Sequence, residues 1–225
     1  MLQGRELFVF RFLKTRLLGK FLIFSNVRPE DRDQLHERLI REIQITNCFI
    51  DIGANEGEVT KFALKENTRS NFRVIAFEPD PIAFSRLSLI ADRRLQLVEA
   101  AVWTQNGIKR LFRHRDFQKN YSTTSSTLIS SKSNVTAEDC VLVRTLDIVD
   151  LVRDAGDNSL VIKIDAEGAE YAILFRLIRK RLIKKTKIIF CEFHPLKIRF
   201  GILMHSLLHL LFMLSRNKSR ISNWY

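Results

Sequence analysis

Four short polar blocks hold the residues of this sequence that could do chemistry, and each block directly follows an apolar run. The blocks are DIGANEG from Asp51 to Gly57, EPD from Glu78 to Asp80, DAEGAE from Asp165 to Glu170, and EFHP from Glu192 to Pro195. Short apolar runs bounded by polar residues predict buried strands of a parallel sheet. Because such sheets place their ligands at the carboxyl ends of the strands, we expect the four blocks to meet at one edge.

The first block follows a predicted strand, Cys48 to Ile52, and precedes a predicted helix, Gly57 to Lys65. In this setting glycines let the backbone approach a ligand closely, and helix N–H groups face an anion. A tight strand-to-helix turn without any ligand explains the same glycine spacing equally well. The second block is therefore needed to decide between the two interpretations.

Glu78 ends the predicted strand Arg73 to Phe77 and stands 21 positions after Gly57. In nucleotide-binding α/β folds, an acid at this place accepts hydrogen bonds from ribose hydroxyls. The sequence has neither the GxGxxG loop nor a P-loop Gly-Lys-Ser/Thr, which disfavours a pyrophosphate or triphosphate ligand. An adenosine with an amino-acid tail fits better, and S-adenosylmethionine fits best. A nicotinamide-dependent oxidoreductase is disfavoured by the same loop.

Asp165, Glu167 and His194 follow the two later strands, which are predicted over Leu160 to Ile164 and Lys187 to Glu192. A protonated hydroxyl is a poor nucleophile, so transfer of a group to it benefits from a general base, and Asp165 and His194 are the candidates. A histidine before proline also has a purely structural interpretation. Clustered acids could instead bind Mg²⁺, which the sequence favours less. We predict no metal ligand.

The elements that must position these residues alternate between short apolar runs and amphipathic stretches. This alternation predicts an α/β fold with a mostly parallel sheet and helices on both faces. The further predicted strands are Leu95 to Val98 and the hairpin-like pair Ile108 to Phe112 and Val141 to Thr145, around a Ser/Thr-rich loop from Ser122 to Ser133. The further predicted helices are Pro29 to Gln44, Pro81 to Asp92, Tyr171 to Leu182 and Gly201 to Leu214.

The blocks DIGANEG, AFEPDP, KIDAEGAE and CEFHP, in this order between Phe49 and Pro195, resemble the FkbM family of methyltransferases. The resemblance implies a class I, Rossmann-like methyltransferase fold with S-adenosylmethionine as the cofactor. It also implies methylation of a hydroxyl oxygen on a sugar, glycan or related small molecule. The alternative is a non-catalytic methyltransferase-like protein that binds a ligand or associates with a membrane.

The resemblance also assigns expected roles to individual residues. The methionine part of the cofactor is expected beside the first block, the ribose at Glu78, and the adenine near the end of the third strand, while three residues face the acceptor. The cofactor set is Asp51, Gly53, Ala54, Asn55, Gly57, Glu78, Pro79, Asp80, Glu99, Ala100 and Ala101, and the catalytic set is Asp165, Glu167 and His194.

Three parts are predicted along the chain: a basic, amphipathic and helical extension over 1–46, the methyltransferase domain over 47–200, and a basic, apolar helical tail over 201–225. Class I folds usually end in a reversed hairpin after the fifth strand, and this tail does not match that pattern. Either the sheet lacks that hairpin or the chain is truncated. The apolar segments Glu6 to Phe24 and Gly201 to Leu214 are too interrupted or too short to cross a bilayer, which takes about 20 residues.

The net charge of the 225 residues is +12, and most of it lies near the end of the chain. From Tyr171 onward there are 12 Lys and Arg residues and one acid, Glu192, which makes 12 − 1 = +11. This end could face an anionic membrane or form solvated helix faces. No specific nucleic acid is predicted, because Leu and Ile rather than aromatics separate the cations. The sequence has three cysteines that lie far apart, which indicates a reducing compartment, and we expect the protein in the cytoplasm. Its basic ends could also bring it into peripheral contact with a membrane.

Overall fold

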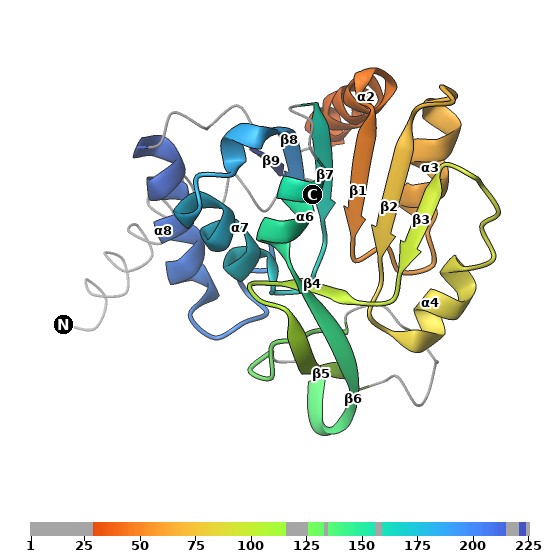
Figure 1. Ribbon diagram of the computed structural model, residues 1–225. Coiled ribbons are helices and arrows are strands. Elements are labelled where there is room, and N and C mark those ends of the chain that lie inside the picture. Colours follow the sequence, from red (N-terminus) through yellow and green to blue (C-terminus); the bar gives the residue numbers. More distant parts are fainter. Residues whose placement is uncertain (1–28, 116–125, 133–134, 156–158, 215–220, 224–225) are drawn as a thin grey trace, which may run out of the picture.

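Six parallel strands form the central sheet of the computed structural model, in the order β3-β2-β1-β7-β8-β9 (Figure 1). The structure describes residues 29–115, 126–132, 135–155, 159–214 and 221–223. The strands are β1 Cys48–Ile52, β2 Arg73–Phe77, β3 Leu95–Val98, β7 Leu160–Ile164, β8 Thr186–Cys191 and β9 Ile221–Asn223. Counted within this sheet, the order is the 3-2-1-4-5-6 order of the doubly wound nucleotide-binding fold. The predicted Rossmann-like α/β fold is confirmed.

Helices cover both faces of the sheet, as predicted (Figure 1). They are α2 Pro29–Ile45, α3 Glu58–Glu66, α4 Pro81–Leu87, α6 Ile148–Asp154, α7 Glu170–Arg179, the 3₁₀ turn η2 Ile183–Lys185, and α8 Gly201–Leu214. Successive residues of a strand point to opposite faces of the sheet, so β1 packs with the helices on both faces. Phe49 packs with residues of α2 and α3, and Ile50 packs with residues of α6, α7 and α8.

Helix α4 ends at Leu87, five residues before the predicted end at Asp92. The difference has a packing cause. A Cβ atom on Gly57 would lie 2.5 Å from Ile90 Cδ1 and 2.6 Å from Leu87 Cδ1, which shows how closely this segment lies over the end of the glycine-rich loop. The chain leaves the helix and brings Ile90 onto Gly57.

A second, three-stranded sheet with the order β4-β6-β5 adjoins the carboxyl edge of the first sheet (Figure 1). Its strands are β4 Ala101–Trp103, β5 Gly107–His114 and β6 Val135–Asp147. The antiparallel pairing of β5 with β6 confirms the predicted hairpin-like strands. Thr127, in the described part of the Ser/Thr-rich loop, forms a bridge to Phe112 of β5. Residues 122–125 and 133 of that loop lie outside the described residues.

The C-terminal tail adds one helix and one strand to the fold. Helix α8 packs beside α7, and β9 extends the sheet in parallel to β8, with Ile189 opposite Ile221. Within the described residues every strand pair of the six-stranded sheet is parallel. The division of the chain at residues 46 and 200 remains a prediction. None of the described helices combines the length and the hydropathy that crossing a membrane requires, and Glu6 to Phe24 lies outside the described residues.

Candidate functional site

A cavity of about 210 Å³ opens at the carboxyl edge of the central sheet, where β1, β2 and β7 end. Apolar side chains of both sheets form much of its wall, among them Phe77, Val102 and Leu111. Eight of the fourteen predicted site residues line it: Gly53, Asn55, Glu78, Pro79, Ala100, Ala101, Asp165 and Glu167. The structure thus brings residues from three of the four sequence blocks to one cavity.

Three backbone N–H groups of the glycine-rich loop donate hydrogen bonds to residues at the end of β2, two to a carbonyl and one to a side chain. The N–H groups of Gly53 and Ala54 both donate to the carbonyl of Phe77, each at 3.0 Å. The N–H of Asn55 donates to Glu78 Oε2 at 2.8 Å. Gly53 and Asn55 both have positive φ, at 74° and 48°. The loop is therefore a fixed turn that faces the cavity.

Gly53 is required by a close approach between two loops of the protein. A Cβ atom there would lie 1.9 Å from the backbone carbonyl oxygen of Asp165, at the end of β7. No side chain fits at this distance, and the backbone conformation at φ +74° disfavours one as well. The sequence interpretation attributed the glycines to the approach of a ligand, whereas the closest approach in the structure is made by β7.

The Glu78 carboxylate lies between the first two loops and is 6% exposed. Its Oε1 accepts a hydrogen bond from the N–H of Asp80 at 2.8 Å, and its Oε2 accepts the one from Asn55. Burial raises the pKa of Glu78 to about 7, although both backbone hydrogen bonds act in the opposite direction. A carboxylate oxygen can accept a second hydrogen bond. Glu78 can therefore also accept hydroxyl groups from a ligand in the cavity.

Lys163, which the sequence analysis did not assign to the site, ties the loops of β1 and β7 together. Its Nζ donates to the Gly53 carbonyl at 2.9 Å and lies 3.2 Å from Asp51 Oδ1 and 3.6 Å from Asp165 Oδ2. Burial favours the neutral amine, but the carboxylates of Asp51 and Asp165 outweigh it and raise the pKa of Lys163. A lysine within the apolar run LVIKI was the available signal, because a buried cation needs partners.

Asp165 and Glu167 both line the cavity, and their surroundings shift their pKa values in opposite directions. The Asp165 side chain is 30% exposed, and burial raises its pKa to about 6, although Lys163 lowers it in part. Burial also acts to raise the pKa of Glu167, but His194 and Lys132 outweigh it, so the pKa is lowered. Of the two, Asp165 is the better proton acceptor near neutral pH.

His194 lies within a group of three carboxylates and does not line the cavity. Its Nδ1 is 3.1 Å from Glu170 Oε1, and its Nε2 is 3.3 Å from Glu192 Oε1 and 3.4 Å from Glu167 Oε2. Burial would lower the pKa of His194, but the carboxylates raise it to about 10. The imidazole is therefore protonated at neutral pH and cannot take a proton from the hydroxyl group of a substrate.

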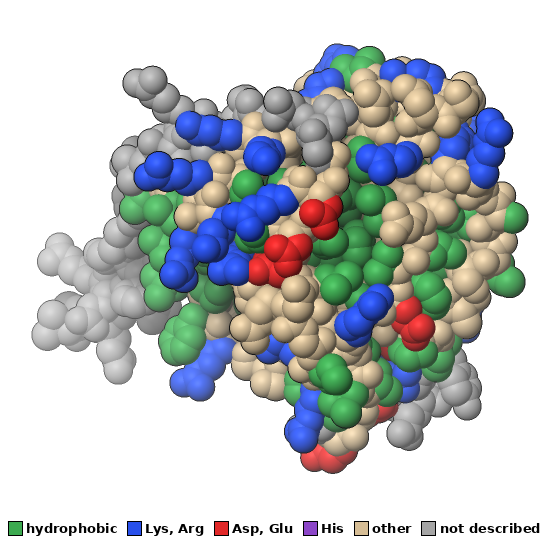
Figure 2. Space-filling view, in the orientation of Figure 1, with side chains coloured by type: hydrophobic (Ala, Val, Ile, Leu, Met, Phe, Trp, Pro, Cys, Tyr) green, Lys and Arg blue, Asp and Glu red, His purple; other side chains and the backbone are tan. Residues whose placement is uncertain are grey.

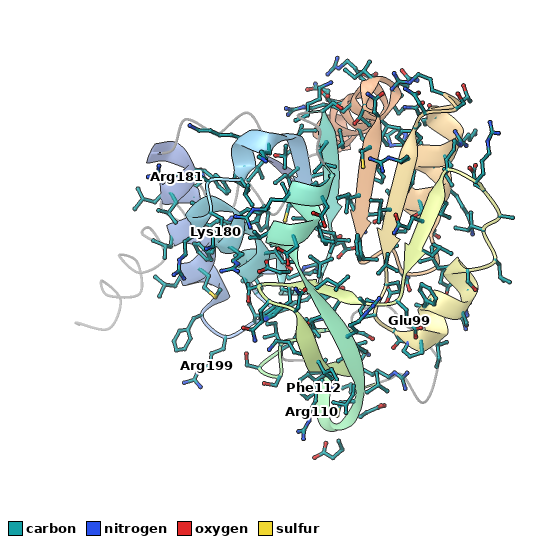
Figure 3. All side chains as sticks on the ribbon, viewed as in Figure 1. Glu99, Arg110, Phe112, Lys180, Arg181 and Arg199 are labelled. Carbon is teal, nitrogen blue, oxygen red and sulfur yellow. The ribbon has the colours of Figure 1, made fainter. Side chains whose placement is uncertain are left out.

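Six predicted site residues do not line the cavity. Besides His194, Asp51 and Asp80 have side-chain hydrogen bonds elsewhere in the protein. Asp51 is buried and accepts a hydrogen bond from Thr60 Oγ1 at 2.8 Å. Asp80 caps α4 and accepts a hydrogen bond from Arg113 Nε at 3.0 Å, while Glu99 is exposed at the end of β3 (Figure 3). The six are Asp51, Ala54, Gly57, Asp80, Glu99 and His194, and their cofactor or catalytic roles remain predictions.

Asp165, Glu167 and His194 each offer one possible metal ligand atom, and these atoms lie within 4.8 Å of one another. Cations of the protein already face two of them: Lys132 Nζ is 2.7 Å from Glu167 Oε2, and Lys163 is the neighbour of Asp165. Mg²⁺ prefers oxygen ligands, so an imidazole in the set also disfavours it. Lys132 comes from the Ser/Thr-rich loop, where no sequence pattern pointed to the site.

Solved structures that are similar to this chain share little sequence with it. A methyltransferase FkbM from Methylobacillus flagellatus KT is 18% identical, with 75% of this chain and 37% of that chain covered and a TM-score of 0.47. The plantazolicin methyltransferase BpumL, solved in complex with SAH, is 9% identical, with coverages of 87% and 73% and a TM-score of 0.34. The chain thus spans little more than a third of the length of the Methylobacillus protein.

No curated protein matches the sequence. The family model of the methyltransferase FkbM domain matches residues 51–220, which include every block from the glycine-rich loop to the tail. The match covers the three loops that line the cavity as well as α8. The chain belongs to the FkbM methyltransferase family.

Proposed function

We propose that this chain transfers the methyl group of S-adenosylmethionine to a hydroxyl oxygen of a sugar, glycan or related small molecule. The observation that carries the proposal is the pairing, across one cavity, of a hydroxyl-accepting carboxylate, Glu78, with a proton-accepting carboxylate, Asp165. The first suits a cofactor ribose, and the second suits an acceptor hydroxyl. Family membership supports methyl transfer, and the choice of oxygen as the methylated atom rests on the cavity.

The cavity has the features that an adenosine with an amino-acid tail needs. The ribose hydroxyls would bind Glu78 at the end of β2, and the adenine would lie against the small side chains of Ala100 and Ala101. The methionine part would face the loop of Gly53 and Asn55, on the side toward Asp165. These assignments use six of the lining residues and require no pyrophosphate-binding loop.

The bound cofactor supplies an electrophilic methyl group on a sulfonium, and the residues of the chain position and deprotonate the acceptor. Displacement requires the acceptor oxygen in line with the methyl carbon at about 3 Å, and such positioning contributes several kcal/mol to a lower barrier. The apolar wall of Phe77, Val102 and Leu111 limits access of water to this place.

Asp165 is the proposed general base, and it accepts the hydroxyl proton at a carboxylate oxygen. It lines the cavity, and with a pKa of about 6 it is ionised at pH 7 yet more basic than an ordinary aspartate. A base of this kind contributes about 10²- to 10⁴-fold to the rate. His194 does not act as a base. It carries a positive charge, and this charge holds the Glu167 carboxylate in place.

The acceptor side of the cavity is formed by the loop before β6 and by β5, through Ser126, Thr127, Leu128 and Leu111. Thr127 is fixed there, because its Oγ1 donates to the carbonyl of Glu167 at 2.7 Å. The combination of hydroxyl and apolar groups suits an acceptor with both hydroxyls and C–H faces, as sugars have.

A labelled transfer experiment tests the proposal. The full chain is incubated with S-adenosylmethionine carrying a trideuterated methyl group and a panel of sugars, glycans and hydroxylated lipids, with and without EDTA. We expect a labelled methyl ether on one class of acceptor, formed by the wild type and lost in Asp165→Asn. Binding of S-adenosylhomocysteine without transfer to any acceptor would favour the non-catalytic alternative, and transfer to nitrogen or sulfur would refute O-methylation.

A further inference from the structure

Helix α8 exposes a row of leucines on the side that faces away from the sheet. Leu203, Leu207 and Leu210 are 68%, 48% and 51% exposed, and their spacing of four and three residues places them on one face of the helix. Phe200, one turn earlier, is 64% exposed. We call these four residues the α8 face. The opposite side of α8 packs into the core through Leu208 and Phe212.

An apolar face of this kind is unusual on the surface of a soluble domain. Helix α8 contains no Lys, Arg, Asp or Glu in its 14 residues, whereas surface helices usually carry charges opposite their buried stripe. Six of the ten large hydrophobic residues that the structure exposes lie between residues 196 and 210. Clustered exposed apolar residues mark sites of interaction with proteins, ligands or membranes.

Three cations lie beside the α8 face. Lys180 and Arg181 follow α7, which packs beside α8, and Arg199 immediately precedes Phe200 (Figure 3). The guanidinium of Arg199 lies 4.9 Å from the centre of the Phe200 ring. Figure 2 shows Lys and Arg side chains beside apolar surface on this side of the molecule. Within the described part of the chain, these three cations form no ion pair with an acid.

We propose that the α8 face and its flanking cations form a docking surface for an anionic lipid bilayer. A helix that lies in the membrane interface inserts one apolar face among the acyl chains and holds its cations at the level of the headgroups. The α8 face with Lys180, Arg181 and Arg199 has this arrangement. Exposed leucines distinguish a bilayer from a nucleic acid, which binds cations and aromatic side chains instead.

This surface is separate from the cavity, since none of its residues lines the cavity. The docking proposal therefore does not depend on the proposed function. It adds a location to it: a methyltransferase held on a bilayer would meet acceptors that are attached to lipids. Failure of vesicle binding would leave the cofactor site unaffected.

Sedimentation with vesicles tests the proposal on the full chain. We expect binding to phosphatidylcholine vesicles that contain phosphatidylglycerol, and much weaker binding to phosphatidylcholine alone. Charge reversal in Lys180→Glu, Arg181→Glu and Arg199→Glu together should reduce binding to anionic vesicles by roughly a hundredfold or more, because each surface cation contributes about fivefold. Leu203→Ser with Leu207→Ser should reduce it by more than tenfold, since both leucines would leave the acyl region.

Matched controls come from the β5–β6 hairpin, where Arg110 and Leu142 are paired across the strands and both are exposed. Arg110→Glu and Leu142→Ser should leave vesicle binding unchanged, and thermal unfolding should show that every variant folds. Equal vesicle binding by the leucine variants and the wild type would overturn the proposal. So would self-association of the wild type that the leucine variants abolish, because a second copy would then cover the face. Binding to RNA that requires the cations but not the leucines would equally overturn it.

Discussion

The binding of S-adenosylhomocysteine should depend on pH through Glu78. Its carboxylate is 6% exposed, and its pKa of about 7 means that the side chain is largely protonated below neutral pH in the free protein. Ribose hydroxyls donate hydrogen bonds, so they favour the ionised carboxylate over the protonated form. Cofactor binding should therefore lower the pKa of Glu78 and become stronger as pH rises to about 8.

The magnitude follows from the ionised fraction. If only the carboxylate form binds, affinity falls about tenfold for each pH unit below 7, or about 1.4 kcal/mol per unit. Between pH 8 and pH 5 the dissociation constant should then rise by roughly a hundredfold. The effect of Glu78 on folding has the opposite sign. Because its pKa is raised in the folded protein, its contribution to the free energy of unfolding is fully present below pH 4.5 and is lost as pH rises through about 7.

Calorimetric titrations of S-adenosylhomocysteine from pH 5 to pH 8 measure this dependence, with Glu78→Gln and Asp165→Asn as the variants. The glutamine cannot ionise, and its amide must face one of the two N–H groups that Glu78 now accepts. It should bind more weakly at pH 8, by about ten- to a hundredfold, and with no pH dependence. Asp165→Asn should keep the wild-type dependence. A flat profile in the wild type, or the same profile in Glu78→Gln, would show that ionisation of Glu78 does not control cofactor binding.

Four further predictions concern the loops and the acidic edge. Gly53→Ala should lower affinity for S-adenosylhomocysteine by at least tenfold, because its Cβ would overlap the Asp165 carbonyl, whereas Gly107→Ala, where only Thr145 Oγ1 lies within 4 Å, should cost about 1–3 kcal/mol of stability and leave affinity intact; equal affinities in calorimetry would contradict this. Asp165→Asn should lower kcat by about 10²- to 10⁴-fold and remove the rise in rate around pH 6, while an unchanged pH–rate profile would show that Asp165 is not the base. His194→Gln should destabilise the fold most below pH 6.5, with a cost that shrinks as pH rises toward 10, because the charged imidazole stabilises only while protonated; urea unfolding at pH 6 and pH 10 measures this, and a constant cost would count against it. EDTA should leave the methyl-transfer rate unchanged, and a loss restored by Mg²⁺ would instead favour a metal at Asp165 and Glu167.

Most strands of the central sheet could be predicted, because the sequence of each is an apolar run of four to six residues that is followed by a polar block. Strands β1, β2, β3 and β7 have the predicted bounds, and β8 begins and ends one residue earlier than predicted. Strands β4 and β9 are three residues long, and only their pairing with β6 and β8 makes them strands. A pattern within such a short segment cannot reveal its partner.

The site could be predicted where its residues end strands of a parallel sheet. Glu78 and Asp165 line one cavity for this reason. Lys132 could not be predicted, because it reaches Glu167 from a loop without periodicity. The charge of His194 could not be predicted either, since it depends on Glu167, Glu170 and Glu192 gathering around one ring in space.

A crystal structure of the full chain with S-adenosylhomocysteine is the most direct test of the central claim that this cavity binds the cofactor. We expect electron density for the ligand in the cavity, with the ribose hydroxyls within hydrogen-bond distance of Glu78 and the adenine beside Ala100 and Ala101. The sulfur should point toward Asp165. Density at another place, or an adenosine in this cavity without contact to Glu78, would show that the cofactor does not bind as proposed.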